Sequence, residues 1–268
     1  GALVAAASRA DQITDTGVYC STAGNYGLAI ATACKRQGIK ASIVMPEWAN
    51  PSKVERMQLL GAEIIKHSDD GDVAKDFAKS IASQNGAPFW EDGVIEEMAL
   101  GSATIAIELL THPRPWDYVL VPLGNGSLMK GIATIFKERS PHTKIVGMVP
   151  KAMPSMFHFI KGNEWDHNAP VSTIAESLGV RVPIPEITEE LKTLVSEVWL
   201  IDESKILPAV RSLMDLEQVM CEPASATPIA GIVDHQTELK GKRVAAIITG
   251  AHLRLSLIPE IMKIKGLL

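Results

Sequence analysis

Six consecutive residues near the start of the chain have the types and the spacing of an anion-binding turn. They form the run Ser21-Thr22-Ala23-Gly24-Asn25-Tyr26, which lies between a short apolar stretch and a long helical pattern. Small, hydroxylated and glycine residues at a strand-to-helix turn let several backbone N–H groups point at one position, and the positive end of the helix dipole adds to their effect. The run therefore indicates a site for a carboxylate or a phosphate.

A second glycine-rich run, Gly124-Asn125-Gly126-Ser127-Leu128, follows an apolar stretch farther along the chain. The N–H groups of such a turn can wrap a phosphate at a helix start. Its glycines, taken with Gly131, do not have the spacing of a dinucleotide fingerprint, and the next predicted strand ends in Pro150-Lys151 rather than in an acidic residue that would hold a ribose. A single phosphate is the better ligand, and a tight turn without any ligand is the alternative.

Two further residues carry polar groups near predicted element ends. Thr249 follows a buried strand, where its hydroxyl either reaches a heteroatom above the sheet or satisfies a local backbone group. Glu222 either complements the dipole of the helix that it starts or is a partly buried carboxylate beside a cofactor. Together, a carboxylate turn, a phosphate turn and a strand-end hydroxyl suit an amino-acid substrate and a small phosphorylated aromatic cofactor, which points to pyridoxal 5'-phosphate.

The elements that must position these residues alternate between short apolar strands and amphipathic helices. This alternation predicts an α/β fold with two doubly wound, mostly parallel sheets and helices on both faces. Ligands bind at the carboxyl ends of such strands, where both runs and Thr249 lie. The predicted strands cover residues 17–20, 41–45, 63–67, 118–122, 144–149 and 243–248. The predicted helices cover residues 28–37, 52–60, 73–84, 102–110 and 128–139, and an irregular stretch covers 165–185.

Composition excludes several classes of function. The 268 residues carry a net charge of −5 with scattered lysines and arginines, which argues against nucleic-acid binding, and no apolar run has bilayer-spanning length, which argues against membrane insertion. The isolated Cys20, Cys34 and Cys221 indicate buried thiols in a reducing, cytoplasmic compartment. The histidines form no ligand pair, so we expect no metal site.

The chain resembles the fold-type II pyridoxal-phosphate-dependent enzymes, specifically the serine/threonine dehydratase (threonine ammonia-lyase) group. The resemblance covers almost the whole chain and keeps the order of the motifs. The first run resembles the S-x-G-N substrate loop, and the second run stands where the tetraglycine phosphate loop belongs. Residues 101–108, 173–176, 222–224 and 249–252 resemble the G-x-G-T-I-x-x-E, T-I-A-D, E-x-A and S-G-G-N motifs.

The resemblance implies a tryptophan synthase β-like fold and a role for each run. Residues 15–92 would form a small substrate-loop domain, and residues 1–14 with 93–268 a large cofactor-binding domain. In the Ser21 to Tyr26 loop, the backbone from Thr22 onward would bind the substrate carboxylate, and the Asn25 side chain would contact the 3-hydroxyl of the cofactor. Gly124, Asn125, Gly126, Ser127 and Leu128 would hold the phosphate, and Thr249 would meet the pyridine nitrogen. The group commonly forms homodimers.

The largest departure from the group is a missing lysine. The Schiff-base lysine of the family lies in an S-x-K-x-R-G-A segment, and this chain begins at the G-A of that segment. We therefore expect that lysine upstream of Gly1 and assign no catalytic residue within the chain, which we interpret as a fragment. Lys35, Lys53 and Lys130 are expected on solvated helical faces. Asn125 and Ser127 replace two glycines, so the phosphate loop must accept side chains there.

The implied reaction is the β-elimination of a β-hydroxy amino acid, of the L-threonine or L-serine type, to a 2-oxo acid and ammonia. Ala23 stands where racemases of the group carry a second catalytic serine, which favours a lyase over a racemase. Two alternatives stay open. One is a pyridoxal-phosphate-dependent β-replacement enzyme similar to cysteine or threonine synthases, and the other is a non-catalytic ligand-binding relative that lacks the lysine.

Overall fold

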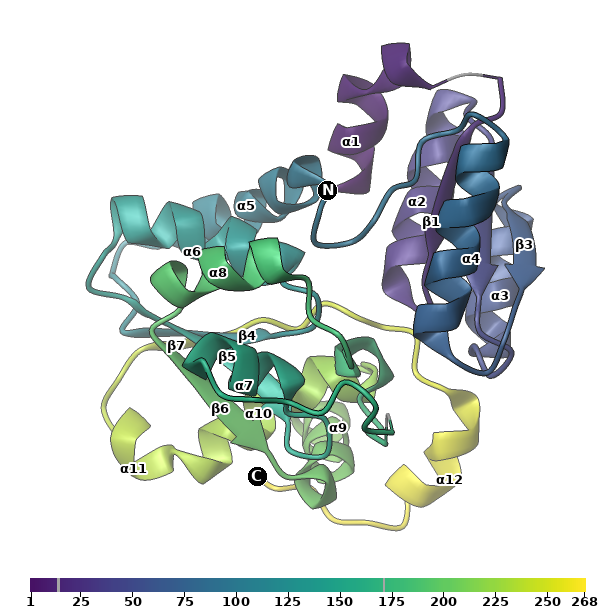
Figure 1. Cartoon of the computed structure of the whole chain (residues 1–268). Coiled ribbons are helices and arrows are strands. Elements are labelled where there is room, and N and C mark those ends of the chain that lie inside the picture. The colour runs from purple at the N-terminus through teal and green to yellow at the C-terminus, as the bar shows by residue number, and fades with distance from the viewer. Residues whose placement is uncertain (14, 171) are drawn as a thin grey trace. The chain divides into compact units, whose positions relative to one another are not determined.

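The chain folds around two separate parallel sheets, one in each of two compact units (Figure 1). The computed structural model describes every residue except Thr14 and Val171, so one position of the predicted irregular stretch lies outside the described residues. The first unit is Gly1–Gly101 and the second is Ser102–Leu268. The predicted fold class, with two doubly wound parallel sheets, is confirmed.

The first unit contains a three-stranded sheet in the order β1-β2-β3, with all strands parallel. Successive side chains of a strand point to opposite faces. Val44 accordingly packs against Ala74 and Ala78 of α4, whereas Ile43 packs with Met57 of α3 and with α2 on the other face. The elements are α1 (Ala2–Ser8), η1 (Ala10–Gln12), β1 (Val18–Ser21), α2 (Asn25–Gln37), β2 (Ala41–Met45), α3 (Pro51–Leu59), β3 (Glu63–Lys66), α4 (Gly71–Gln84) and the start of α5 (Glu96–Leu110).

The second unit contains a four-stranded parallel sheet in the order β6-β5-β4-β7. Leu120 of β4 faces a core formed with α9 and α10, and Val119 and Val121 face a core formed with α6 and α8 (Figure 1). The elements are β4 (Tyr118–Pro122), α6 (Ser127–Arg139), β5 (Lys144–Pro150), α7 (Ser155–Lys161), η2 (Glu176–Leu178), α8 (Pro185–Leu194), β6 (Glu197–Ile201), α9 (Glu203–Glu217), α10 (Pro223–Asp234), α11 (Gln236–Leu239), β7 (Val244–Ala246), η3 (Leu255–Leu257) and α12 (Ile258–Ile261).

The predicted elements agree with the structure in the first half of the chain and less well in the second. Strand β6 and helices α8 and α9 were absent from the prediction, only the start of α10 was predicted, and β7 is shorter than the predicted strand at 243–248. Both α9 and α10 contain an internal proline, Pro208 and Pro228, which ordinarily breaks a helix. The buried faces of these two helices stabilise them despite the proline.

The three cysteines are free and buried, as predicted. Burial raises the pKa of the Cys34 thiol to about 11 and that of the Cys221 thiol to about 12. In the described part of the chain, no helix is both long and apolar enough to cross a membrane.

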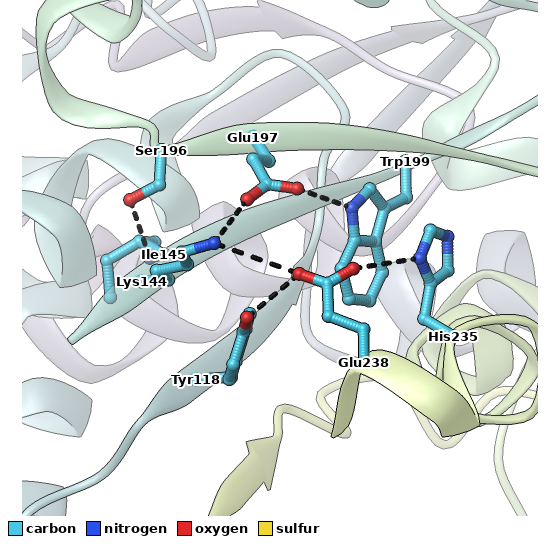
Figure 2. A network of polar contacts seen from close by, with 8 residues as sticks. All are labelled: Tyr118, Lys144, Ile145, Ser196, Glu197, Trp199, His235 and Glu238. Atoms are coloured by element: carbon cyan, nitrogen blue, oxygen red, sulfur yellow. Dashed lines mark hydrogen bonds and ion pairs between the residues drawn. The ribbon is translucent and has the colours of Figure 1, made fainter. Parts of the chain in front are cut away.

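A polar network joins the amino ends of the large sheet to α11 (Figure 2). Lys144, the first residue of β5, forms a 2.8 Å ion pair with Glu197, the first residue of β6, and lies 3.7 Å from Glu238. Glu238 also accepts a 2.8 Å hydrogen bond from the Tyr118 hydroxyl. The Lys144 ammonium lowers the pKa of the Glu197 carboxyl. This network lies at the sheet edge opposite the carboxyl ends of the strands.

Lys144→Met is expected to lower the free energy of unfolding by about 0.5–1 kcal/mol near pH 7, because the ion pair is partly solvated. The pKa of Glu197 is lower in the folded than in the unfolded protein, so its contribution is present above the unfolded pKa and is lost as the pH falls through the folded pKa. Urea unfolding should therefore show a smaller difference between variant and wild type at pH 3 than at pH 7. Equal differences at both values would contradict this origin of the effect.

Candidate functional site

The first predicted run forms a strand-to-helix turn at the carboxyl end of β1. Its backbone continues the sheet for one more residue, since the Thr22 N–H donates to the Val44 carbonyl at 3.0 Å. The Thr22 hydroxyl then accepts a 2.9 Å hydrogen bond from the Gly24 N–H, which tightens the turn. Helix α2 begins at Asn25, and no side chain caps its start at Gly24. The first N–H groups of α2 lack partners within the helix, so an anion can use them.

The turn packs closely against the first turn of α2 and against α3. A Cβ atom at Gly27 would lie 2.6 Å from Thr22 Cγ2 and 2.9 Å from Met57 Sδ. Thr22 and Met57 therefore leave no space for a side chain at residue 27. Any side chain at Gly27 would displace Thr22, whose hydroxyl shapes the turn.

Tyr26 contributes to this turn through its backbone rather than its hydroxyl. Its side chain packs with the core of the first unit, and its hydroxyl oxygen is buried without a hydrogen-bond partner among the described residues. Burial raises the pKa of Tyr26 well above its ordinary value, and the nearby Cys20 adds to the rise. The hydroxyl therefore stays protonated in the folded unit.

The expectation that Lys53 lies on a solvated face is wrong, because this side chain is only 3% exposed. It precedes Met57 by four residues on α3, and side chains four positions apart share a helix face. Met57 packs beneath Gly27, so Lys53 belongs to the same buried face of the helix. Lys35 and Lys130 do reach the surface, where they bind a carbonyl oxygen and a carboxylate.

The second predicted run lies between β4 and α6, and its two remaining glycines are structurally required. Gly126 has φ +104° at the N-cap of α6, a conformation that favours glycine. A Cβ there would lie 2.9 Å from the ends of Ile187 and Leu191, and a Cβ at Gly124 would lie 2.8 Å from a backbone oxygen, that of Ser177. The close backbone approach is what a phosphate cradle needs, so this loop fits the phosphate of pyridoxal phosphate.

The replacement of two loop glycines creates no backbone strain. Among the described residues, the non-glycine positions with positive φ are Ser68 and Gln218, so Asn125 and Ser127 have ordinary backbone conformations. The chain thus keeps glycine where the loop needs positive φ or close approach and replaces it where it does not.

Thr249 lies at the same sheet edge as this loop. Strands β4 and β7 are parallel neighbours, and their alignment continues past the end of β7, because the Ile247 N–H donates to the Leu120 carbonyl at 3.0 Å. Thr249 is exposed, whereas Gly250 is buried and donates its N–H to Ser225 Oγ at 2.6 Å. The structure therefore brings the loop and Thr249 together at the carboxyl edge of the large sheet, while the Ser21–Tyr26 turn belongs to the other unit.

Glu222 is a buried carboxylate at the start of α10. It is 4% exposed and precedes α10 without capping it through its side chain. Its Oε1 accepts a 3.0 Å hydrogen bond from Ser177 Oγ, and a Cβ at Gly250 would lie 2.3 Å from the same oxygen. Ser177 was not singled out in the sequence, because a serine in an irregular stretch has no pattern of its own.

No group of histidine, cysteine, aspartate and glutamate residues in the described part of the chain could hold a metal ion. The groups that these residues offer are suited to binding: backbone N–H groups at two helix starts and one exposed hydroxyl.

Two doubly wound parallel sheets with a phosphate-type loop at the carboxyl edge of one define the class of fold-type II pyridoxal-phosphate enzymes. The family described as "Pyridoxal-phosphate dependent enzyme" matches residues 1–250, and the chain belongs to this family. Pyridoxal 5'-phosphate is therefore its cofactor.

Known relatives confirm the resemblance to the threonine ammonia-lyase group. The chain is 30% identical over 251 residues to "L-threonine ammonia-lyase" of Thermotoga maritima, covering 94% of this chain and 62% of that protein. It is 30% identical over 257 residues to "L-threonine dehydratase catabolic TdcB" of Staphylococcus aureus, covering 94% of this chain and 74% of that protein. The processed form of threonine deaminase isoform 2 from Solanum lycopersicum shares the fold, with a TM-score of 0.87 at 24% identity, covering 98% of this chain and 78% of that one. The chain thus spans 62–74% of the length of these two curated relatives.

Proposed function

We propose that the protein containing this chain is a pyridoxal-phosphate-dependent ammonia-lyase that acts on L-threonine or L-serine. The observation that carries this proposal is the glycine-rich loop at the start of α6, with Gly126 at φ +104°, in a chain similar to threonine ammonia-lyases. Bound pyridoxal phosphate supplies an electron sink at the α-carbon of an amino acid. Loss of the α-proton and of the β-hydroxyl as water, followed by hydrolysis, gives a 2-oxo acid and ammonia.

Each part of the site has one task in this proposal. The N–H groups from Thr22 to Tyr26 bind the substrate carboxylate and orient the amino acid, and Asn25 contacts the 3-hydroxyl of the cofactor. The N–H groups of residues 124–128 bind the phosphate. The neutral hydroxyl of Thr249 meets the pyridine nitrogen and leaves it unprotonated, which makes the ring a weaker electron sink and suits elimination over transamination.

The proposed active site also needs a base that removes the α-proton of the substrate. In the family this is the Schiff-base lysine, and we expect it upstream of Gly1 in the full-length protein. We further propose that residues 1–14 fold with the large domain that starts at residue 93, and that the protein is a cytoplasmic homodimer. Light scattering of the full-length protein tests the dimer.

The full-length protein with pyridoxal phosphate is expected to release ammonia and 2-oxobutanoate from L-threonine, or ammonia and pyruvate from L-serine. Product analysis with and without an added thiol distinguishes elimination from β-replacement, which would instead yield a new amino acid. A protein that binds the cofactor and releases no product from either amino acid would be the non-catalytic relative, and the proposal would be wrong.

A further inference from the structure

A short segment of the second unit lies against the phosphate loop, and we call it the strap (residues 173–178). One carboxylate holds its start. Glu203 Oε1 accepts a 2.7 Å hydrogen bond from the Thr173 hydroxyl, and Oε2 accepts a 3.0 Å hydrogen bond from the Ile174 N–H. The Thr173 hydroxyl oxygen in turn accepts a 3.0 Å hydrogen bond from the buried Ala175 N–H. Both oxygens of Glu203 are therefore committed to the strap.

Two further charged groups hold the other end of the strap. Glu176 forms a 2.5 Å ion pair with Arg254, and the Ser177 hydroxyl donates to the buried Glu222 at 3.0 Å. Leu178 is buried in the core between the sheet, α9 and α10. Hydrogen bonds to ionised groups are stronger than neutral ones, so the strap has a defined conformation although it contains little regular structure.

The fixed strap contacts the phosphate loop directly and reaches Thr249 only through Glu222 and Gly250. The Ser177 carbonyl oxygen would lie 2.8 Å from a Cβ at Gly124, the first residue of the phosphate loop. The carboxylate of Glu222, which Ser177 holds, packs against Gly250, the residue after Thr249. A displacement of the strap must therefore act first on the backbone of the phosphate loop.

Glu203 is not needed to start its own helix. Asp202 is the N-cap of α9, and its Oδ1 accepts a 2.9 Å hydrogen bond from the Ser204 N–H. Two adjacent acidic residues thus divide two tasks: Asp202 stabilises the helix start, and Glu203 holds the strap. This division provides a matched control within the chain.

We propose that Glu203 is a positioning residue for the cofactor phosphate, which acts through the strap on the backbone of the loop at Gly124. The proposal rests on the proposed function, in which residues 124–128 hold that phosphate. It predicts that the loss of Glu203 weakens the binding of the phosphorylated cofactor far more than the binding of pyridoxal, which lacks the phosphate.

Equilibrium dialysis of the full-length protein with pyridoxal phosphate, and separately with pyridoxal, tests the proposal. Glu203→Ala should lower the affinity for pyridoxal phosphate about 10- to 100-fold, the effect of losing one or two charge-assisted hydrogen bonds. The affinity for pyridoxal should change less than about threefold, because no phosphate contact is involved. Glu203→Gln should recover part of the loss, since its amide oxygen can still accept from the Ile174 N–H.

Asp202→Ala is the matched control, because it removes the neighbouring carboxylate and destabilises α9 without touching the strap. It should lower the unfolding midpoint and leave the ratio of the two affinities unchanged. Should Glu203→Ala fail to fold, Glu203→Gln and Thr173→Val carry the same comparison.

Three results would overturn the assignment of Glu203: an unchanged affinity for pyridoxal phosphate, an equal loss for both compounds, or an equal effect of Asp202→Ala. A wild-type full-length protein that binds no pyridoxal phosphate would instead refute the proposed function, and the role of Glu203 with it.

Discussion

Gly126→Val is expected to lower the affinity of the full-length protein for pyridoxal phosphate by about 100-fold, equivalent to losing about two charge-assisted hydrogen bonds. A valine cannot adopt φ +104° without strain, and its Cβ would lie 2.9 Å from the ends of Ile187 and Leu191. The loop must then rotate, so the N–H groups at the start of α6 no longer converge on the phosphate. Equilibrium dialysis measures the affinity, and the rise in unfolding temperature caused by the cofactor provides a second measure.

Gly241→Ala separates this effect from backbone strain alone. Gly241 has φ +74°, and no atom lies within 4 Å of a Cβ placed there. The substitution introduces backbone strain of about 1 kcal/mol outside the loop and should leave cofactor affinity unchanged. Equal losses of affinity in the two variants would show that global destabilisation, not the cradle, explains the result.

The sequence predicted the first sheet well because its signals are local. Each strand there is short, apolar and followed by a helix with a clear amphipathic pattern, as in Ala41–Met45, whose bounds the prediction matches. In the second half of the chain, the helices are harder to predict from the sequence. Pro208 and Pro228 lie inside α9 and α10, where proline ordinarily breaks a helix, and the burial of both helices in the core stabilises them nevertheless.

In the candidate site too, the sequence predicted the features that have local signals and missed those that depend on distant contacts. Glycine-rich turns at strand ends were visible in the sequence, because their backbone requirement restricts residue type. The contacts of the strap were not visible, since they join residues 173–178 to Glu203, Glu222 and Arg254, and the two partners of each contact are 29 or more positions apart in the sequence. A carboxylate at a helix start has the same appearance whether it caps the helix, as Asp202 does, or holds a distant segment.

Gly27→Ala is expected to lower the free energy of unfolding by about 1–2 kcal/mol. Alanine is favoured over glycine in a helix by up to about 1 kcal/mol, so a destabilising effect requires a larger opposing cost. The Cβ at residue 27 would lie 2.6 Å from Thr22 Cγ2 and 2.9 Å from Met57 Sδ, and such overpacking costs about 1–3 kcal/mol. Because the Thr22 hydroxyl shapes the carboxylate turn, the variant full-length protein should also show a raised KM for its amino acid.

Thr22→Ser provides the rescue for this variant, because it removes the Cγ2 methyl and keeps the hydroxyl that accepts from the Gly24 N–H. In urea unfolding, the double variant should recover about 1 kcal/mol relative to the sum of the single effects, a coupling typical of residues in direct contact. If Gly27→Ala is as stable as the wild type in both backgrounds, the turn is not held against α2 in this way. A rescue of stability without recovery of KM would separate the packing of the turn from its binding of the carboxylate, since the two depend on different atoms of Thr22.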